Sequence, residues 1–178
     1  MEPKIVIIED DQDYAKTLVD FLKEMLSLSE KNLSFTGGLY QETEAWLENF
    51  SPAGEEKIIF VVDGTLAQSQ FDFGVDEGNG FGLFFRWLSN LITQMEERGK
   101  PKEEIENLLR NFCVILNTGD PKMLKEDFPP YKQLRELCEG RVGKLVTNHL
   151  KDISGVTEAI TDFISREGNR PGIERKGG

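Results

Sequence analysis

Apolar residues alternate between two patterns along the chain. Short runs rich in β-branched residues lie at 4–8, 33–36, 57–62, 112–116 and 144–147. Such continuous apolar runs are typical of parallel strands that are buried on both faces. Between them, apolar residues repeat with the helical period in segments 14–26, 41–50, 84–95, 102–111, 131–138 and 156–164. The aromatic residues of segment 84–95 are interpreted as core, with any excess aromatic surface left for a partner.

This order of elements predicts the fold. Strand–helix units that repeat five times, with an extra helix before the fourth strand, imply βαβ crossovers and an open sheet covered on both faces. We expect a doubly wound, flavodoxin-like (βα)5 α/β domain with strand order 2-1-3-4-5, formed by residues 1–166. Residues 68–80 are expected to form an enlarged loop after the third strand, and residues 167–178 a flexible tail or linker.

Composition and charge exclude several classes of function. The 178 residues include 21 basic and 32 acidic side chains, and the net charge of −11 would repel a phosphate backbone, so nucleic-acid binding is not expected. No apolar run approaches the roughly 20 residues that span a membrane, and the first residues lack the pattern of a signal peptide. Cys113 and Cys138 lie within apolar segments, which predicts buried thiols and a cytoplasmic location.

Polar residues follow the expected strands. The strand ends carry Glu9-Asp10-Asp11, Asp63, Asn117-Thr118 and Thr147-Asn148-His149. In an open α/β sheet, ligands bind at this carboxyl edge. Crowded carboxylates are unfavourable unless a cation or a proton offsets them, and Mg²⁺ with its preference for oxygen ligands does so. The sequence therefore predicts a metal site at Glu9, Asp10 and Asp63, whereas Asp11 is more simply interpreted as a helix cap.

Three of these segments resemble those of response-regulator receiver domains. They are KIVIIEDDQDYAKTL, KIIFVVDG and CVILNTGD, and the resemblance extends over residues 4–165. It implies that Asp63 is the phosphoacceptor, and that Asp10, Asp63 and the Thr65 carbonyl bind Mg²⁺ directly. Glu9 would bind the ion through water. The Thr118 hydroxyl would donate a hydrogen bond to the phosphoryl oxygens.

The resemblance also implies a function in a two-component phosphorelay. Gly64 and Gly119 would let the backbone approach the phosphoryl group. A histidine kinase or a phosphotransfer protein would be the donor, and the domain would catalyse its own phosphorylation and dephosphorylation. Output would pass to a downstream protein partner, and a homodimer through the last two (βα) units is compatible with this arrangement.

One departure from the family pattern leaves an alternative open. Receiver domains have a lysine followed by a proline after the fifth strand, whereas LVTNHL places Asn148 or Thr147 at the lysine position. Candidates for a substitute cation are Lys144, Lys151 and Lys122, and spacing does not choose among them. The alternative function is therefore a pseudo-receiver, which binds its partners without phosphorylation.

A second resemblance is weaker. IIFVVDGTLAQS is similar to the first motif, DxDGT, of haloacid-dehalogenase-type phosphatases, and KLVTN is similar to their second motif. The nucleophile of that family is the first aspartate of the motif, and Val61 stands at its position. A valine side chain cannot attack phosphorus, so a degenerate phosphatase is the less favoured alternative.

Overall fold

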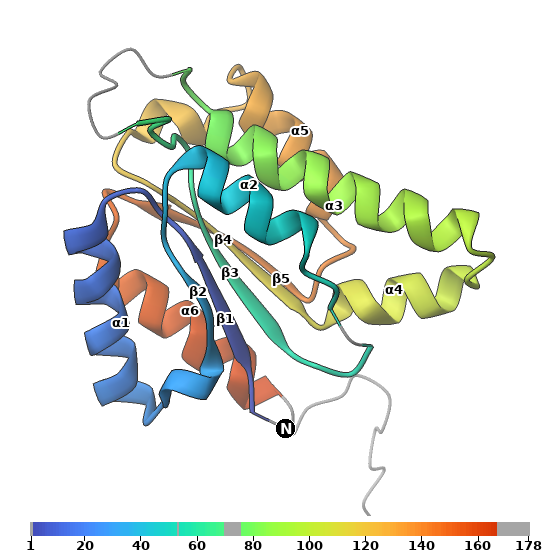
Figure 1. The fold of residues 1–178 in the computed structure, drawn as a ribbon, viewed down its shortest axis with the longest axis horizontal. Coiled ribbons are helices and arrows are strands. Elements are labelled where there is room, and N and C mark those ends of the chain that lie inside the picture. The colour runs from blue at the N-terminus through green and yellow to red at the C-terminus, as the bar shows by residue number, and fades with distance from the viewer. Residues whose placement is uncertain (1, 53, 70–75, 167–178) are drawn as a thin grey trace, which may run out of the picture.

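A five-stranded, all-parallel sheet forms the centre of the computed structural model, which describes residues 2–52, 54–69 and 76–166 (Figure 1). The strands are β1 (Lys4–Ile8), β2 (Leu33–Thr36), β3 (Ile58–Asp63), β4 (Phe112–Thr118) and β5 (Lys144–His149). Their order across the sheet is β2-β1-β3-β4-β5. The predicted doubly wound, flavodoxin-like α/β fold is confirmed.

Strand register places the ends of the strands level with one another. Ile8 of β1 pairs with Val62 of β3, and Asp63 pairs with Asn117 of β4. Asn117 pairs in turn with Asn148 of β5. The polar residues that follow the apolar runs therefore meet at the carboxyl edge of the sheet, as the alternation of strands and helices requires.

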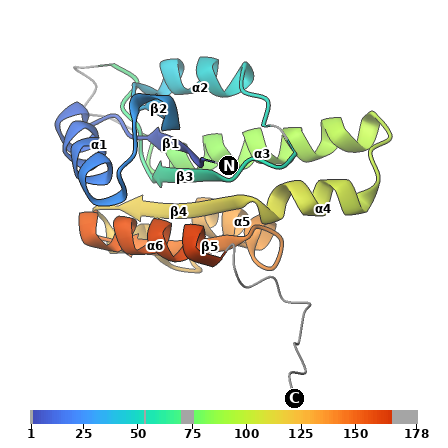
Figure 2. The ribbon, with the colours of Figure 1, turned by 90° about the horizontal axis from the view of Figure 1, so that it is seen from below.

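Helices cover both faces of the sheet (Figures 1 and 2). They are α1 (Gln12–Leu26), α2 (Tyr40–Glu48), α3 (Asn79–Glu97), α4 (Lys102–Arg110), α5 (Pro129–Cys138) and α6 (Ile153–Ser165). α1 and α6 lie on one face, whereas α2, α3 and α5 lie on the other, and α4 is the extra helix expected before β4. None of the helices in the described part of the chain is long and apolar enough to cross a membrane.

Alternate residues of each strand enter two separate cores. Ile59 and Val61 of β3 pack on the side of α1 and α6, whereas Phe60 and Val62 pack on the side of α2 to α5. Phe60 is fully buried, and its ring lies 5.0–6.3 Å from four other aromatic rings, namely those of Phe50, Phe84, Trp87 and Phe112. The prediction that Cys113 and Cys138 are buried thiols is also confirmed.

The structure refines several of the predicted boundaries. β4 and β5 each extend two residues beyond the apolar run, to Thr118 and His149, because hydrogen bonding continues past the apolar side chains. Two 3₁₀ helices, η1 (Glu30–Asn32) and η2 (Pro121–Leu124), lie in connections that show no helical period. α3 begins at Asn79, inside the expected loop. Residues 70–75 of that loop and the expected tail at 167–178 lie outside the described residues.

Candidate functional site

Three carboxylates converge at the carboxyl edge. Glu9 and Asp10 follow β1, Asp63 ends β3, and one oxygen atom of each residue lies within 4.8 Å of those of the other two. Glu9 and Asp63 are buried, with 1% and 6% of their surface exposed, and Asp10 is partly exposed. The sequence-based expectation that these residues meet follows from the register of β1 with β3. An acidic cluster of this kind could hold a metal ion.

The turn after β3 is tied to this cluster. The Ala67 backbone N–H donates to Asp10 Oδ2 at 2.8 Å. The side chain of Asn79, at the start of α3, bonds both backbone groups of Leu66, accepting from its N–H at 2.6 Å and donating to its carbonyl at 2.8 Å. The turn that carries the residues after Asp63 is therefore held at both ends, which fixes the backbone beside the carboxylates.

Three glycines at the carboxyl edge differ in the space that surrounds them. A side chain at Gly80 would place its Cβ 2.1 Å from the Asp63 carbonyl oxygen, so α3 can begin against the strand end only with glycine. At Gly64, a Cβ would lie 2.8 Å from Met123 Sδ. No atom lies within 4 Å of a Cβ built at Gly119. A side chain at Gly64 would therefore displace Met123, whereas the described residues leave the space beside Gly119 open.

Lys151 supplies a cation to the cluster. Its Nζ lies 2.8 Å from Glu9 Oε2 and 3.3 Å from Asp63 Oδ2, and it bridges the two buried carboxylates. Lys144, another of the three candidate lysines, forms an ion pair with Asp162 at the opposite end of β5. The structure thus selects Lys151 among candidates that the sequence left open.

A short turn after β5 brings Lys151 into place. Leu150 and Lys151 have φ angles of +56° and +51°, in the left-handed region that non-glycine residues rarely adopt. The Lys151 N–H donates to the Thr118 carbonyl at 3.3 Å, and its own carbonyl accepts from the Tyr14 hydroxyl at 3.0 Å. The ammonium group lies 5.1 Å from the centre of the Tyr14 ring. These contacts hold a strained turn that aims the lysine at the carboxylates.

Asn148 stabilises this turn and contacts no carboxylate of the cluster in the described structure. Its buried side chain donates to Asn117 Oδ1 and to the Asp152 carbonyl, each at 2.8 Å. Asn117 donates in turn to the Tyr14 hydroxyl at 2.9 Å. The sequence placed Asn148 or Thr147 at the position of the lysine in receiver domains. Asn148 is buried in this network, and Thr147 is exposed. A chain of hydrogen bonds thus connects β4, β5 and α1 behind Lys151.

Burial governs the charges of the site. Burial, and secondly the negative charge of Asp63, raises the pKa of Glu9 to about 8, although Lys151 opposes this shift. Burial also raises the pKa of Asp63 to about 6, against the stabilising charge of Lys151. Burial alone would lower the pKa of Lys151, but the two carboxylates together raise it above its usual range. The lysine is therefore charged and the acids are poised to exchange a proton for a cation.

The hydroxyls near the cluster are covered by a sulfur atom. The Thr118 hydroxyl accepts from the Asp120 N–H at 3.1 Å and lies 3.7 Å from Met123 Sδ. The Thr65 hydroxyl accepts from the Gly78 N–H at 3.0 Å and lies 3.5 Å from the same sulfur. Thr118 is only 2% exposed. No sequence signal pointed to Met123, which reaches the site because η2 folds back over β4.

The arrangement suits a divalent cation with oxygen ligands. The carboxylates of Glu9, Asp10 and Asp63 supply such oxygen atoms. The Thr65 carbonyl, which the resemblance also implied as a ligand, accepts no hydrogen bond from the described residues. Lys151 provides an ammonium group beside the same oxygens. A bound divalent cation and this ammonium group would together set three positive charges against the three carboxylates, which lowers the electrostatic cost of an anion next to Asp63.

Comparison with protein-family models, curated proteins and solved structures finds no match to this chain. Its function is therefore inferred from the geometry and chemistry of the site.

Proposed function

We propose that this protein is the phosphoacceptor domain of a two-component phosphorelay, in which Asp63 accepts a phosphoryl group in the presence of Mg²⁺. One observation carries the proposal: Lys151 bridges Glu9 and Asp63 at the strand ends where three carboxylates converge. The order of the motifs along the sheet supports it. A histidine kinase or a phosphotransfer protein would be the donor, and output would pass to a protein partner.

The chemistry requires positioning and charge neutralisation more than covalent assistance. Bound Mg²⁺ would neutralise the carboxylates and the incoming phosphoryl oxygens. An Asp63 oxygen attacks phosphorus while the bond from phosphorus to the donor atom breaks, and the donor leaves with that electron pair. Lys151 Nζ, 3.3 Å from Asp63 Oδ2, can then pair with a phosphoryl oxygen and remain neutralised.

Met123 connects this chemistry to a change in structure. Its sulfur is a weak acceptor for the Thr118 hydroxyl, whereas a phosphoryl oxygen is a strong one. Phosphorylation would therefore turn the hydroxyl toward Asp63 and release the contact with η2, which carries Met123. The connection between β4 and α5 would change its packing, and a partner could recognise the difference.

A specific observation also favours the pseudo-receiver alternative. The Lys151 ammonium offsets one of the two buried negative charges, and the pKa of Glu9, raised to about 8, lets a proton offset the other without any metal ion. Met123 meanwhile packs against the hydroxyl that would respond to phosphate. In that alternative, the same residues form a stable surface that binds a partner without phosphorylation.

Labelling by a small phosphodonor separates the two functions. Wild-type protein incubated with acetyl phosphate and Mg²⁺ should gain the mass of one phosphoryl group, and EDTA should prevent the gain. Asp63→Asn should abolish labelling. Asp11→Asn is the matched control, because the Asp11 side chain caps α1 by accepting from the Tyr14 N–H and lies outside the cluster.

The outcomes are distinct. A label that persists in Asp63→Asn contradicts the assignment of the phosphoacceptor. A wild-type protein that binds Mg²⁺ but takes no label, with acetyl phosphate or with phosphoramidate, supports the pseudo-receiver. The phosphatase alternative has no nucleophile, since Val61 is 1% exposed and packs in the core on the side of α1 and α6.

A further inference from the structure

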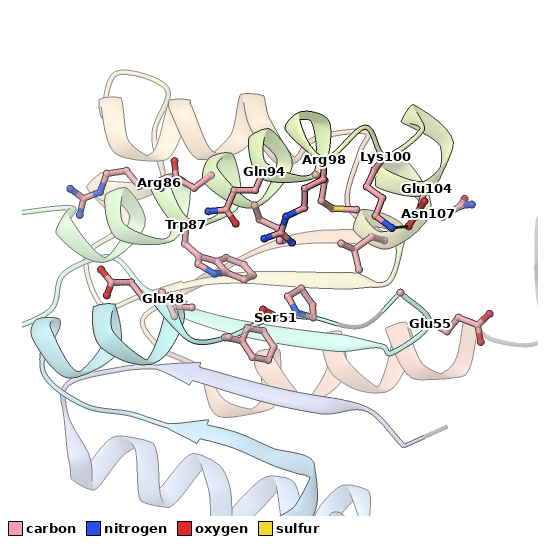
Figure 3. A pocket seen from close by; sticks show the side chains of 18 of the residues that line it. Glu48, Ser51, Glu55, Arg86, Trp87, Gln94, Arg98, Lys100, Glu104 and Asn107 are labelled. Atoms are coloured by element: carbon pink, nitrogen blue, oxygen red, sulfur yellow. Dashed lines mark ion pairs between the residues drawn. The ribbon is translucent and has the colours of Figure 1, made fainter.

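A groove of about 980 Å³ lies between α3, α4 and the segment that follows α2 (Figure 3). Ligand pockets are usually of about 300–1,000 Å³, so this space is at the upper end of that range. Its apolar surface includes the partly buried side chains of Phe50, Trp87, Leu91 and Met95. Figure 3 shows the Trp87 indole in the middle of the groove, between a rim on α3 that carries Arg86 and Arg98 and an opposite rim that carries Glu48.

The lengths of the helices create this groove. α3 has 19 residues and α2 has only 9, so the far half of α3 lies beyond the cover of α2 (Figure 1). α4, the helix added to the five strand–helix units, forms a further wall. Along α3, Trp87, Leu91 and Met95 follow one another at intervals of four residues, which places them on one face. This stripe of apolar side chains remains partly exposed.

The rims of the groove carry an excess of acid. Arg86 pairs with Glu44 at 3.9 Å, and Lys100 pairs with Glu104 at 3.1 Å. These pairs neutralise four of the eight charged residues of the lining. In the described part of the chain, no ion pair forms at the others, which are Arg98, Glu48, Glu55 and Glu103. Arg98 stands on the α3 rim, and Glu48 and Glu55 on the opposite rim (Figure 3).

We propose that this groove binds a basic amphipathic helix of a protein partner. Apolar side chains of that helix would cover the stripe formed by Trp87, Leu91 and Met95, because a tryptophan and an adaptable methionine are favourable anchors for a partner. Its lysines and arginines would face the acids that lack ion pairs, and one acidic side chain would face Arg98. The net charge of −11 favours the approach of such a segment.

The dimensions of the groove agree with a helix. From Arg86 to Arg98 the axis of α3 advances about 18 Å, the length of roughly three helical turns. The groove lies toward the amino ends of the strands, since Phe50 and Glu55 lead into β3 and α4 leads into β4. The inference is therefore independent of the phosphoacceptor function proposed at the carboxyl edge.

Synthetic peptides test the proposal directly. The probe is a fluorescent helical peptide of about 14 residues, with leucine at positions i, i+3, i+4 and i+7 and lysine on its flanks. Its acidic twin carries glutamate at every lysine, and a scrambled twin lacks the apolar face. Fluorescence anisotropy should show the basic peptide binding at least roughly 10-fold more tightly than either twin, and less tightly at high salt. Amide shifts should change along α3 and α4.

Variants locate the binding. Met95→Lys and Glu48→Lys should each weaken binding of the basic peptide by roughly 10-fold. The matched controls are Met25→Lys and Glu24→Lys on the exposed surface of α1, which should leave the affinity unchanged. Glu48 is exposed, so this variant is expected to fold.

Several results would overturn the proposal. Equal affinity for the basic and acidic peptides would do so, as would binding that neither groove variant changes, or no binding by any peptide. If sedimentation shows self-association that Met95→Lys abolishes, the groove is an interface between copies of this chain. Displacement of the bound peptide by small aromatic acids, with no salt dependence, would identify a small-molecule pocket.

Discussion

The two ends of the sheet differ in which kind of side chain is buried and which is exposed. At the carboxyl edge, charged groups are buried, with Glu9 only 1% and Asp63 only 6% exposed. At the groove near the amino edge, the charges are exposed and apolar side chains such as Trp87 are left partly uncovered. Electrostatics therefore dominates the first region, whereas apolar burial dominates the second. Changes of pH should act on the first, and deletions of apolar atoms on the second.

The largest expected effect is on the aromatic core beneath the groove. Phe60→Ala removes a fully buried ring that contacts four other aromatic rings. We expect the free energy of unfolding to fall by about 3–5 kcal/mol, from lost burial and from the cavity left behind. Urea denaturation at two pH values measures it. Phe85→Ala, at a partly buried position of α3, is the control and should cost less.

The comparison predicts that this loss is independent of pH, because the rings that surround Phe60 belong to phenylalanine and tryptophan side chains, which do not titrate. A loss that differs by more than about 1 kcal/mol between pH 6 and pH 9 would show that the two regions are energetically coupled.

Lys151→Met should have the next largest effect, and one that depends on pH. Above pH 8, it leaves Glu9 and Asp63 without their cation, so that each must either remain charged in a buried site or take up a proton, and breaking a buried pair in this way typically costs about 3–5 kcal/mol. At pH 5 the acids hold their protons and the loss should be small. Lys144→Met is the control, because its partner Asp162 is 45% exposed and exposed ion pairs contribute little to stability.

Urea denaturation of both lysine variants at pH 5 and pH 9 measures the difference. Equal losses of unfolding free energy for Lys151→Met at the two pH values would mean that the ion pairs of Lys151 do not carry its contribution.

The carboxyl edge was largely predictable from sequence because strand ends determine it. In a parallel sheet each apolar run ends at the same edge, so Glu9, Asp10 and Asp63 meet regardless of loop details. Lys151 was only one candidate among three. Its position depends on positive φ angles at two non-glycine residues, Leu150 and Lys151, and no local pattern in LVTNHL indicates such a turn.

The groove could not be predicted, because it depends on how far helices extend relative to one another. The sequence indicated a helical segment over residues 84–95 with aromatic residues interpreted as core. Phe84 is indeed buried, but Trp87 is only partly so, since α2 ends at Glu48 and leaves part of α3 uncovered. Relative helix length and tertiary placement are not encoded in the periodicity of one segment.

The pH dependence of stability provides a third test, at the site alone. Without divalent cations, the free energy of unfolding should fall as the pH rises from about 4.5 to about 8. Burial raises the pKa of Glu9 from 4.5 to about 8 and that of Asp63 from 3.8 to about 6. In this range the native state therefore holds protons that the unfolded chain has lost, so its stability decreases.

We expect a fall of several kcal/mol across this range, measured by urea denaturation in EDTA. Asp63→Asn should reduce it, because the charge that raises the pKa of Glu9 is removed. Glu48→Gln, at the exposed rim of the groove, should leave the slope unchanged. A stability that increases with pH in EDTA would contradict the raised pKa values.

The smallest expected effect concerns the Tyr14 hydroxyl, which connects the turn of Lys151 to Asn117 of β4. Tyr14→Phe removes the group that donates to the Lys151 carbonyl and accepts from Asn117 Nδ2, at 3.0 and 2.9 Å. We expect a loss of about 1–2 kcal/mol in unfolding free energy, since the loss of two hydrogen bonds leaves the Asn117 amide, which is 1% exposed, with an unsatisfied donor. Tyr131→Phe is the control and should change stability by less than about 0.5 kcal/mol.

If Tyr14 only supported the fold, Tyr14→Phe would lower stability equally at every pH. However, Tyr14 also orients the strained turn that carries Lys151. Tyr14→Phe should therefore weaken the neutralisation of Glu9 and Asp63, and the drop in stability between pH 5 and pH 8 should become steeper than in wild type. Denaturation series at several pH values would measure this slope. A parallel downward shift of the whole curve would instead show that Tyr14 supports the fold without positioning the lysine. Because no hydrogen bond between the described residues connects the groove with this network, binding of the basic peptide should be the same in Tyr14→Phe and wild type.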